Sequence, residues 1–204
     1  SYRRQRQMCI RDSKKSLNIL RKTDALLEGH FILSSGLHSS KYIQCAKLLS
    51  FPFKAEKICK SLANKIKKNF KKIDLILAPA MGGIVIGYEI GRLLKKETIF
   101  CERVNGKFIL RRGFKIKAKS RVLIIEDVIT TGKSSMECVK LIEKAKAKSI
   151  GFATIIDRSS KKSLKIKKKI ISHLKIKIPT YKFNQLPNDL KFIPITKPGS
   201  RYIK

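Results

Sequence analysis

Two adjacent carboxylates, Glu126 and Asp127, end an apolar run in the stretch RVLIIEDVITTGKSS, residues 121–135. Neighbouring like charges repel each other at the rim of a low-dielectric core, so a buried strand tolerates them only where solvent or a ligand compensates their charge. Ionised carboxylates only accept hydrogen bonds, which suits the hydroxyl groups of a sugar. The pair therefore predicts a polar ligand at the end of this strand.

A glycine-containing turn, Thr130–Ser134, follows the carboxylates and precedes a helical pattern. Gly132 lets the backbone approach an anion closely, the neighbouring hydroxyls can donate to phosphate oxygens, and the first N–H groups of the helix can hold the same group. A Walker-type phosphate loop needs glycine where Asp127 stands, so that class is excluded. Together with the carboxylates, the turn predicts a sugar-phosphate site; the alternative is a solvated strand end followed by an ordinary helix cap.

The elements that must position these residues alternate between strands and helices. Apolar runs predict strands at 73–79, 97–104, 121–127 and 149–157, helical spacing predicts helices at 16–27, 52–69, 84–96 and 133–147, and strand–turn–strand patterns occur at 29–49 and 97–116. Alternating strands and helices are typical of an α/β protein with a central, mainly parallel sheet flanked by helices. In such a sheet, ligands bind beyond the carboxyl ends of the strands, where Thr130–Ser134 is expected.

Composition limits the classes that remain. The longest apolar runs are far shorter than the roughly 18 residues that span a bilayer. The five cysteines are scattered without a Cys-x-x-Cys pair, which argues against a zinc site or a disulfide framework and favours the cytoplasm. The formal net charge of +34 raises nucleic acid as a partner, but general Lys and Ile enrichment explains it better, because no basic stretch carries the interleaved aromatic residues of a single-strand binder, so we expect no nucleic-acid role.

The stretch VLIIEDVITTGKS resembles the signature with which type I phosphoribosyltransferases bind 5-phosphoribosyl 1-diphosphate (PRPP). Three further segments are similar to the orotate phosphoribosyltransferase family: GHFILSSGLHSSKYIQCA, APAMGGIVIGYEIGR with ERVNGKFILRRGF, and the terminal KPGSR. The resemblance covers about residues 24–201. It implies a single phosphoribosyltransferase domain at 14–204, with a small hood mainly at 16–50, a core at about 51–160 and a mobile hairpin loop. Residues 1–13 are expected to be an extension outside the family pattern.

The resemblance also implies an activity, namely transfer of the phosphoribosyl group of PRPP to orotate, which gives orotidine 5'-monophosphate and pyrophosphate in pyrimidine synthesis. Catalytic roles are implied for Asp127, Glu126, Arg103 and Lys107. PRPP contacts are implied for Glu126, Asp127, Val128, Ile129, Thr130, Thr131, Gly132, Lys133, Ser134, Met81, Gly82, Gly83, Arg111 and Arg112. Orotate contacts are implied for Thr130, Arg158, Ser34, Ser35 and Gly36. Mg²⁺ is expected to be held mainly by the substrate, and a homodimer is expected in which the loop crosses into the partner's site.

Two alternatives remain open from the residues alone. The carboxylate pair and the phosphate turn specify the sugar and not the base, so a phosphoribosyltransferase for a purine or another base fits them too. A PRPP-sensing regulator that binds nucleic acid would use the positive charge. His30 and His38 flank the first expected turn, and we expect packing rather than acid–base roles for them.

Overall fold

The computed structural model describes residues 13–33, 35–160 and 164–198. Contacts divide the chain into two compact units, Ser1–Pro52 with Lys177–Lys204, and Phe53–Ile176. The domain limits expected from the sequence stay predictions. The division adds one feature that the sequence does not predict, because the last part of the chain belongs with the N-terminal unit.

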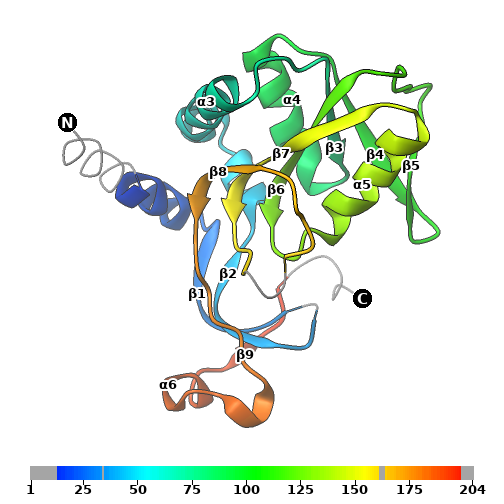
Figure 1. The fold of residues 1–204 in the computed structure, drawn as a ribbon. Coiled ribbons are helices and arrows are strands. Elements are labelled where there is room, and N and C mark those ends of the chain that lie inside the picture. Colours follow the sequence, from blue (N-terminus) through cyan, green and yellow to red (C-terminus); the bar gives the residue numbers. More distant parts are fainter. Residues whose placement is uncertain (1–12, 34, 161–163, 199–204) are drawn as a thin grey trace. The chain divides into compact units, whose positions relative to one another are not determined.

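The second unit is built on a six-stranded sheet in the order β5-β4-β3-β6-β7-β8 (Figure 1). The strands are β3 (Leu75–Pro79), β4 (Thr98–Val104), β5 (Lys107–Leu110), β6 (Arg121–Ile129), β7 (Lys148–Asp157) and β8 (Ile170–Lys175). All neighbours pair in parallel except β4 and β5, which form an antiparallel hairpin. The helices are α3 (Pro52–Asn69), α4 (Gly82–Leu94) and α5 (Lys133–Lys144). The predicted fold class, an α/β protein with a mainly parallel sheet and flanking helices, is confirmed.

Helices α4 and α5 pack against opposite faces of this sheet. Side chains alternate between the two faces along a strand. Leu77 and Ile124 belong to the apolar cluster that includes Cys138 and Ile142 of α5. Ala78, the next residue along β3, faces α4, because a Cβ built at Gly87 would lie 2.7 Å from the Ala78 Cβ. Each face of the sheet therefore brings a different helix to the strand ends.

Several predicted boundaries are wrong. The helix expected at 16–27 occupies 13–22, because Asp24 takes a positive φ of 53° and the N–H of Ala25 returns to the Leu20 carbonyl, which ends the helix. Strand β6 runs on to Ile129, since its pairing with β7 continues to that residue. Helix α5 ends at Lys144, short of residue 147. Strand β8 lies in a Lys-rich region whose sequence shows no strand pattern.

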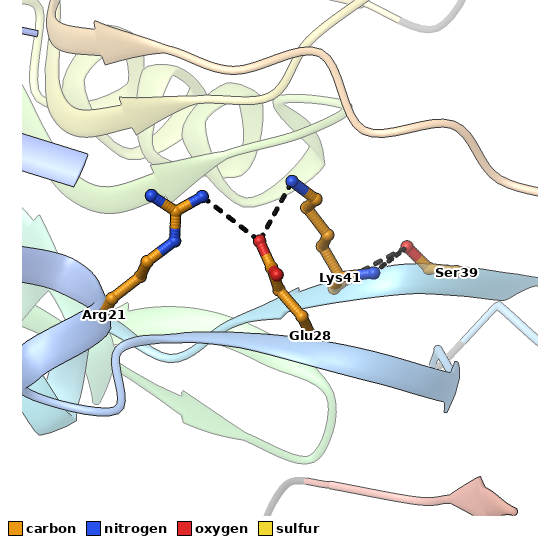
Figure 2. A network of polar contacts seen from close by, with 4 residues as sticks. All are labelled: Arg21, Glu28, Ser39 and Lys41. Atoms are coloured by element: carbon orange, nitrogen blue, oxygen red, sulfur yellow. Dashed lines mark hydrogen bonds and ion pairs between the residues drawn. The ribbon is translucent and has the colours of Figure 1, made fainter. Parts of the chain in front are cut away.

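The first unit holds a three-stranded sheet in the order β2-β1-β9. Its elements are β1 (Leu26–Ile32), β2 (His38–Ile43), α2 (Cys45–Leu49), η1 (Phe183–Gln185), α6 (Asn188–Lys191) and β9 (Ile195–Thr196). The expected hairpin is confirmed as antiparallel β1 and β2. Glu28 of β1 accepts from Arg21 at 3.3 Å and from Lys41 at 3.2 Å, which ties the hairpin to the 13–22 helix (Figure 2).

Candidate active site

The centre of the large sheet contains a topological switch point between β3 and β6. From β3 the chain continues through α4 to β4 on one side, and from β6 it continues through α5 to β7 on the other. Pairing between the two strands stops at Leu77 and Ile124. Beyond Ile124, β6 therefore pairs only with β7, and its edge toward β3 is no longer paired with that strand. Ligands of open α/β sheets bind at such a point. The loop around Met81 and the turn after Ile129 both lie there.

Glu126 is 9% exposed and faces α5. The fully buried hydroxyl of Ser135, in the first turn of that helix, donates a hydrogen bond to Glu126 Oε1. Burial, chiefly, and then the charge of Asp127 raise the pKa of Glu126 to about 7, while the Ser135 bond acts in the opposite direction. This carboxyl therefore changes charge near neutral pH.

Asp127 faces the other side of the sheet, toward α4. Its Oδ1 accepts from the N–H of Val128 at 2.9 Å, and its backbone carbonyl accepts from the Thr154 hydroxyl at 2.9 Å. Burial raises the pKa of Asp127. A Cβ built at Gly82, the first residue of α4, would lie 2.8 Å from the carboxylate carbon and from both carboxylate oxygens. The two adjacent acids thus have separate surroundings, which the sequence does not reveal.

The turn Thr130–Ser134 leads directly into α5. Gly132 is the N-terminal cap of that helix with a φ of 73°, which favours glycine, and α5 begins at Lys133. Thr130 and Thr131 are exposed, so their hydroxyls are accessible. N–H groups at a helix N-terminus carry partial positive charge and suit a phosphate. The geometry therefore fits the anion site that the sequence predicts.

A short segment, Leu164–Ile166, supports this turn and is not predicted from the sequence. The N–H of Lys165 donates to the carbonyl of Thr131 at 2.9 Å. A Cβ at Gly132 would come within 2.6 Å of Ile166, so the isoleucine packs directly on the turn. The sequence does not reveal this role, because the surrounding stretch is rich in Lys and the segment itself contains only two apolar residues, Leu164 and Ile166.

The cationic residues expected on the loop lie on or after the β4–β5 hairpin. Arg103 forms an ion pair with Glu137 of α5 at 2.8 Å, and its guanidinium lies 4.1 Å from the centre of the Phe108 ring. Arg112 pairs with Glu102 of β4 at 2.9 Å. Lys107 and Arg111 are exposed. In this state, two of the four cations are therefore engaged by carboxylates of the chain itself.

The expected orotate residues fall in both units. Arg158 follows β7, and its N–H donates to the Ile129 carbonyl at 2.8 Å, which places its backbone beside the end of β6 and next to Thr130. Ser35 and Gly36 are exposed in the turn between β1 and β2 of the first unit, and Gly36 has a φ of 78°. Ser34 lies outside the described residues.

Two further findings concern metal sites and membranes. Within residues 13–33, 35–160 and 164–198, no group of three His, Cys, Asp or Glu side chains is arranged to hold a metal ion. None of the helices in the described part of the chain is both long and apolar enough to cross a bilayer.

Comparison with known proteins gives a consistent result. Residues 53–189 match the family of the phosphoribosyl transferase domain. The protein named orotate phosphoribosyltransferase in Parvibaculum lavamentivorans is 46% identical over 193 residues, which cover 94% of this chain and 99% of that protein. The protein of the same name in Caldicellulosiruptor saccharolyticus is 44% identical over 188 residues, which cover 92% of this chain and 97% of that protein.

Solved structures agree on the fold. The orotate phosphoribosyltransferase of Aeropyrum pernix superimposes with a TM-score of 0.66 over 78% of this chain and 92% of its own, at 21% identity. The adenine phosphoribosyltransferase of Saccharomyces cerevisiae superimposes with a TM-score of 0.62 over 78% of this chain and 99% of its own, at 18% identity. At such identities the structures show the fold and not the choice of base.

Proposed function

The chain belongs to the phosphoribosyltransferase family and, within it, to the orotate phosphoribosyltransferases, and from this premise we propose how its residues divide the work of the transfer. The reaction moves the phosphoribosyl group of PRPP to orotate, releases pyrophosphate and gives orotidine 5'-monophosphate in pyrimidine synthesis. The observation that carries the assignment of residues is the meeting of the acidic pair and the phosphate turn at the β3–β6 switch point.

The sugar is held from both ends. As pyrophosphate departs, the ribose gains positive charge, so carboxylates fixed nearby stabilise the transition state more than the ground state. Glu126 and Asp127 accept hydrogen bonds from the ribose hydroxyls, each from its own side of strand β6. The N–H groups and hydroxyls of Thr130–Ser134 hold the 5-phosphate, with Val128 and Ile129 as the backbone that leads into the turn.

The leaving pyrophosphate needs N–H groups and cations. The loop Met81–Gly83 offers backbone at the start of α4, and Arg103, Lys107, Arg111 and Arg112 supply the charge, because guanidinium groups bind phosphate in a bidentate manner. Arg103 must exchange Glu137 for pyrophosphate to do so, and Arg112 must exchange Glu102. Closure of the hairpin over the site also excludes water, which would otherwise compete with the base.

Mg²⁺ fits a site whose donors are carboxylates, hydroxyls and phosphates, since it prefers oxygen ligands and keeps several waters. We propose that pyrophosphate and ribose oxygens hold it, with the acidic pair beside it. When bound, the ion neutralises the charge of the leaving group.

Orotate is a planar anion with a carboxylate. Arg158 is proposed to bind that carboxylate, and Thr130 is proposed to donate to the ring edge, because both lie at the end of β6. Ser34, Ser35 and Gly36 are proposed to close over the ring. The reaction is proposed to take place in the cytoplasm, where the four described cysteines, all buried and outside any disulfide, would remain reduced.

A homodimer is proposed in which each loop serves the partner's site. Helix α4 supports it, because Val85 and Tyr88 of the helix are 52% and 68% exposed and Met81, at its N-cap, is 81% exposed, at helical spacing. The variant Tyr88→Glu should therefore sediment as a monomer and lose most of its turnover. A Tyr88→Glu variant that stays dimeric would exclude this face as the interface.

A base panel tests the activity. Purified protein is mixed with Mg²⁺, PRPP and one of orotate, uracil, adenine, guanine or hypoxanthine, and pyrophosphate release is followed. Release with orotate alone is expected. Release with a purine and none with orotate would contradict the assignment.

A further inference from the structure

We propose that Asp157 is a positioning residue for Arg158, because its buried carboxylate fixes the backbone turn that carries the guanidinium. The inference rests on the proposed function of Arg158, which is to bind the carboxylate of orotate. It assigns Asp157 a role in the recognition of the base that involves no contact with the base itself.

Asp157 is the last residue of β7 and lies beside the end of β6. It pairs with Ile129 across the two strands, and the N–H of Arg158 donates to the Ile129 carbonyl at 2.8 Å. Thr130, which begins the turn proposed to bind phosphate, follows Ile129 directly. Arg158 is therefore the first residue beyond β7, at the edge of the sheet where the substrates are proposed to meet.

The Asp157 carboxylate has a partner for each oxygen. Its Oδ1 accepts from the N–H of Ser159 at 2.8 Å, and its Oδ2 forms an ion pair with Lys175 at 3.3 Å. The first contact joins residues two apart, as in an Asx turn, where an aspartate side chain takes the place of a backbone acceptor. Arg158 is the central residue of this turn. The Ile129 carbonyl and the Asp157 carboxylate thus hold the two peptide groups that flank the Arg158 α-carbon.

The bond to Ser159 is the contact that requires an acceptor at position 157. Asp157 is 5% exposed and Ser159 is 8% exposed, so loss of the carboxylate would leave a buried N–H without its partner. Pairing of β7 with β8 does not need the side chain, because the N–H of Ile176 donates to the Asp157 backbone carbonyl at 2.9 Å. The Lys175 side chain is 62% exposed, so solvent weakens its ion pair.

The turn matters because arginine binds a carboxylate through parallel hydrogen bonds that require a defined orientation of the guanidinium plane. Without the carboxylate, the peptide group after Arg158 is free to rotate, which displaces the guanidinium. A displacement of about 1 Å can cost on the order of a hundredfold in rate. The effect should fall on orotate rather than on PRPP, because the groups proposed for PRPP lie on β6, the β4–β5 hairpin and the starts of α4 and α5.

A double-mutant cycle with Arg158 tests the inference. Asp157→Ala, Arg158→Ala and the double variant are compared in the KM for orotate and in the Kd for PRPP with Mg²⁺. Asp157→Ala should raise the KM for orotate about tenfold or more and leave the Kd for PRPP within about twofold of wild type. The double variant should match Arg158→Ala within about threefold, because no guanidinium remains to be positioned. Losses that multiply, or an unchanged KM in Asp157→Ala, would overturn the inference.

Further variants separate the hydrogen bond from the ion pair. Asp157→Asn keeps an acceptor for the Ser159 N–H and should stay within about threefold of the wild-type KM for orotate. Lys175→Met removes only the ion pair and should do the same. A rise in Lys175→Met as large as that in Asp157→Ala would show that the ion pair, and not the turn, positions Arg158. If Asp157→Ala does not fold, Asp157→Ser replaces it, because a hydroxyl forms the same turn more weakly. Its KM should then exceed that of Asp157→Asn, and a wild-type KM would contradict the inference.

The matched control is Asp74→Ala. Asp74 also accepts from a backbone N–H, that of Arg121 at 2.8 Å, and pairs with the guanidinium of the same residue, but at the opposite end of the sheet. Its loss should change neither constant by more than about twofold. An unchanged KM for orotate in Arg158→Ala would refute the proposed function of Arg158. A raised KM in Arg158→Ala with an unchanged KM in Asp157→Ala would leave that function standing and refute the role of Asp157 alone.

Discussion

At the scale of single residues, the two neighbouring acids differ more than their positions suggest. Glu126 lies under α5 with Ser135 as its partner, whereas Asp127 lies at the start of α4 beside Gly82. A carboxyl whose pKa burial raises to about 7 is only partly ionised at neutral pH in the free protein. The Ser135 hydroxyl favours the ionised form, because it donates to the carboxylate.

This predicts an acid limb in the pH profile. Since kcat/KM reports groups of the free enzyme, it should fall as pH drops through about 7, where Glu126 takes up a proton. Ser135→Ala removes a bond that lowers the pKa, so the limb should move to higher pH. Turnover measured across the acid and neutral range in both proteins tests the shift.

The control for this prediction is Ser149→Ala, another buried serine, at the opposite end of the neighbouring strand β7. It should leave the limb in place. A Ser135→Ala profile that superimposes on the wild-type profile would mean that Glu126 does not control the limb.

At the scale of elements, helix α5 connects three parts of the site. Its N-terminus follows the turn Thr130–Ser134 that is proposed to bind phosphate, Ser135 in its first turn contacts Glu126, and Glu137 pairs with Arg103 of the hairpin. The Arg103 contact is a partly exposed ion pair, the kind that contributes about 0.2–1 kcal/mol. That is small enough for a bound pyrophosphate to displace Glu137.

Glu137→Gln should therefore bind pyrophosphate more tightly than the wild type, by roughly 1.5- to 5-fold, since Arg103 no longer has to leave a carboxylate. Calorimetric titration with pyrophosphate and Mg²⁺ measures the change. Glu143→Gln, an exposed residue of the same helix, should bind as the wild type does. Weaker binding by Glu137→Gln would instead make Glu137 a support that keeps Arg103 in its working position.

The sequence predicts elements where apolar spacing is strong and contacts are local. The helix predicted at 52–69 has the same bounds as the observed α3. The predicted order of strands and helices from β3 to β7 is also confirmed. The pattern fails for β8 and Leu164–Ile166, because these Lys-rich segments are ordered by contacts with distant parts of the chain. For the same reason, the sequence identifies the candidate residues of the site but not the contacts that Ser135, Glu137 and Gly82 make with them.

At the scale of the whole molecule, the candidate residues are divided between two units. The sheet unit carries those proposed for PRPP together with Thr130 and Arg158, and the first unit carries Ser35, Gly36 and a buried histidine pair. His30 Nε2 lies 2.6 Å from His38 Nδ1, and His30 Nδ1 lies 3.2 Å from the Ile193 carbonyl. Burial, chiefly, together with the charge of His30, lowers the pKa of His38, so His38 favours the neutral state. These contacts agree with the packing role expected for both histidines.

His38→Ala should consequently weaken the packing of the first unit and leave the packing of the sheet unit unchanged. The expected result is a KM for orotate raised about threefold or more, with a Kd for PRPP within about twofold of wild type, because the altered packing lies among residues proposed for orotate. Steady-state kinetics and calorimetry measure the two constants. An equal loss in both would argue against the division of roles.

The central claim is that the carboxylate pair and the turn after it hold the phosphoribosyl donor. A crystal structure with PRPP and Mg²⁺ tests it most directly. We expect the 5-phosphate among the N–H groups of Thr130–Ser134 and the ribose hydroxyls within hydrogen-bond distance of Glu126 and Asp127. A donor bound elsewhere on the protein, with these groups unoccupied, would contradict the account.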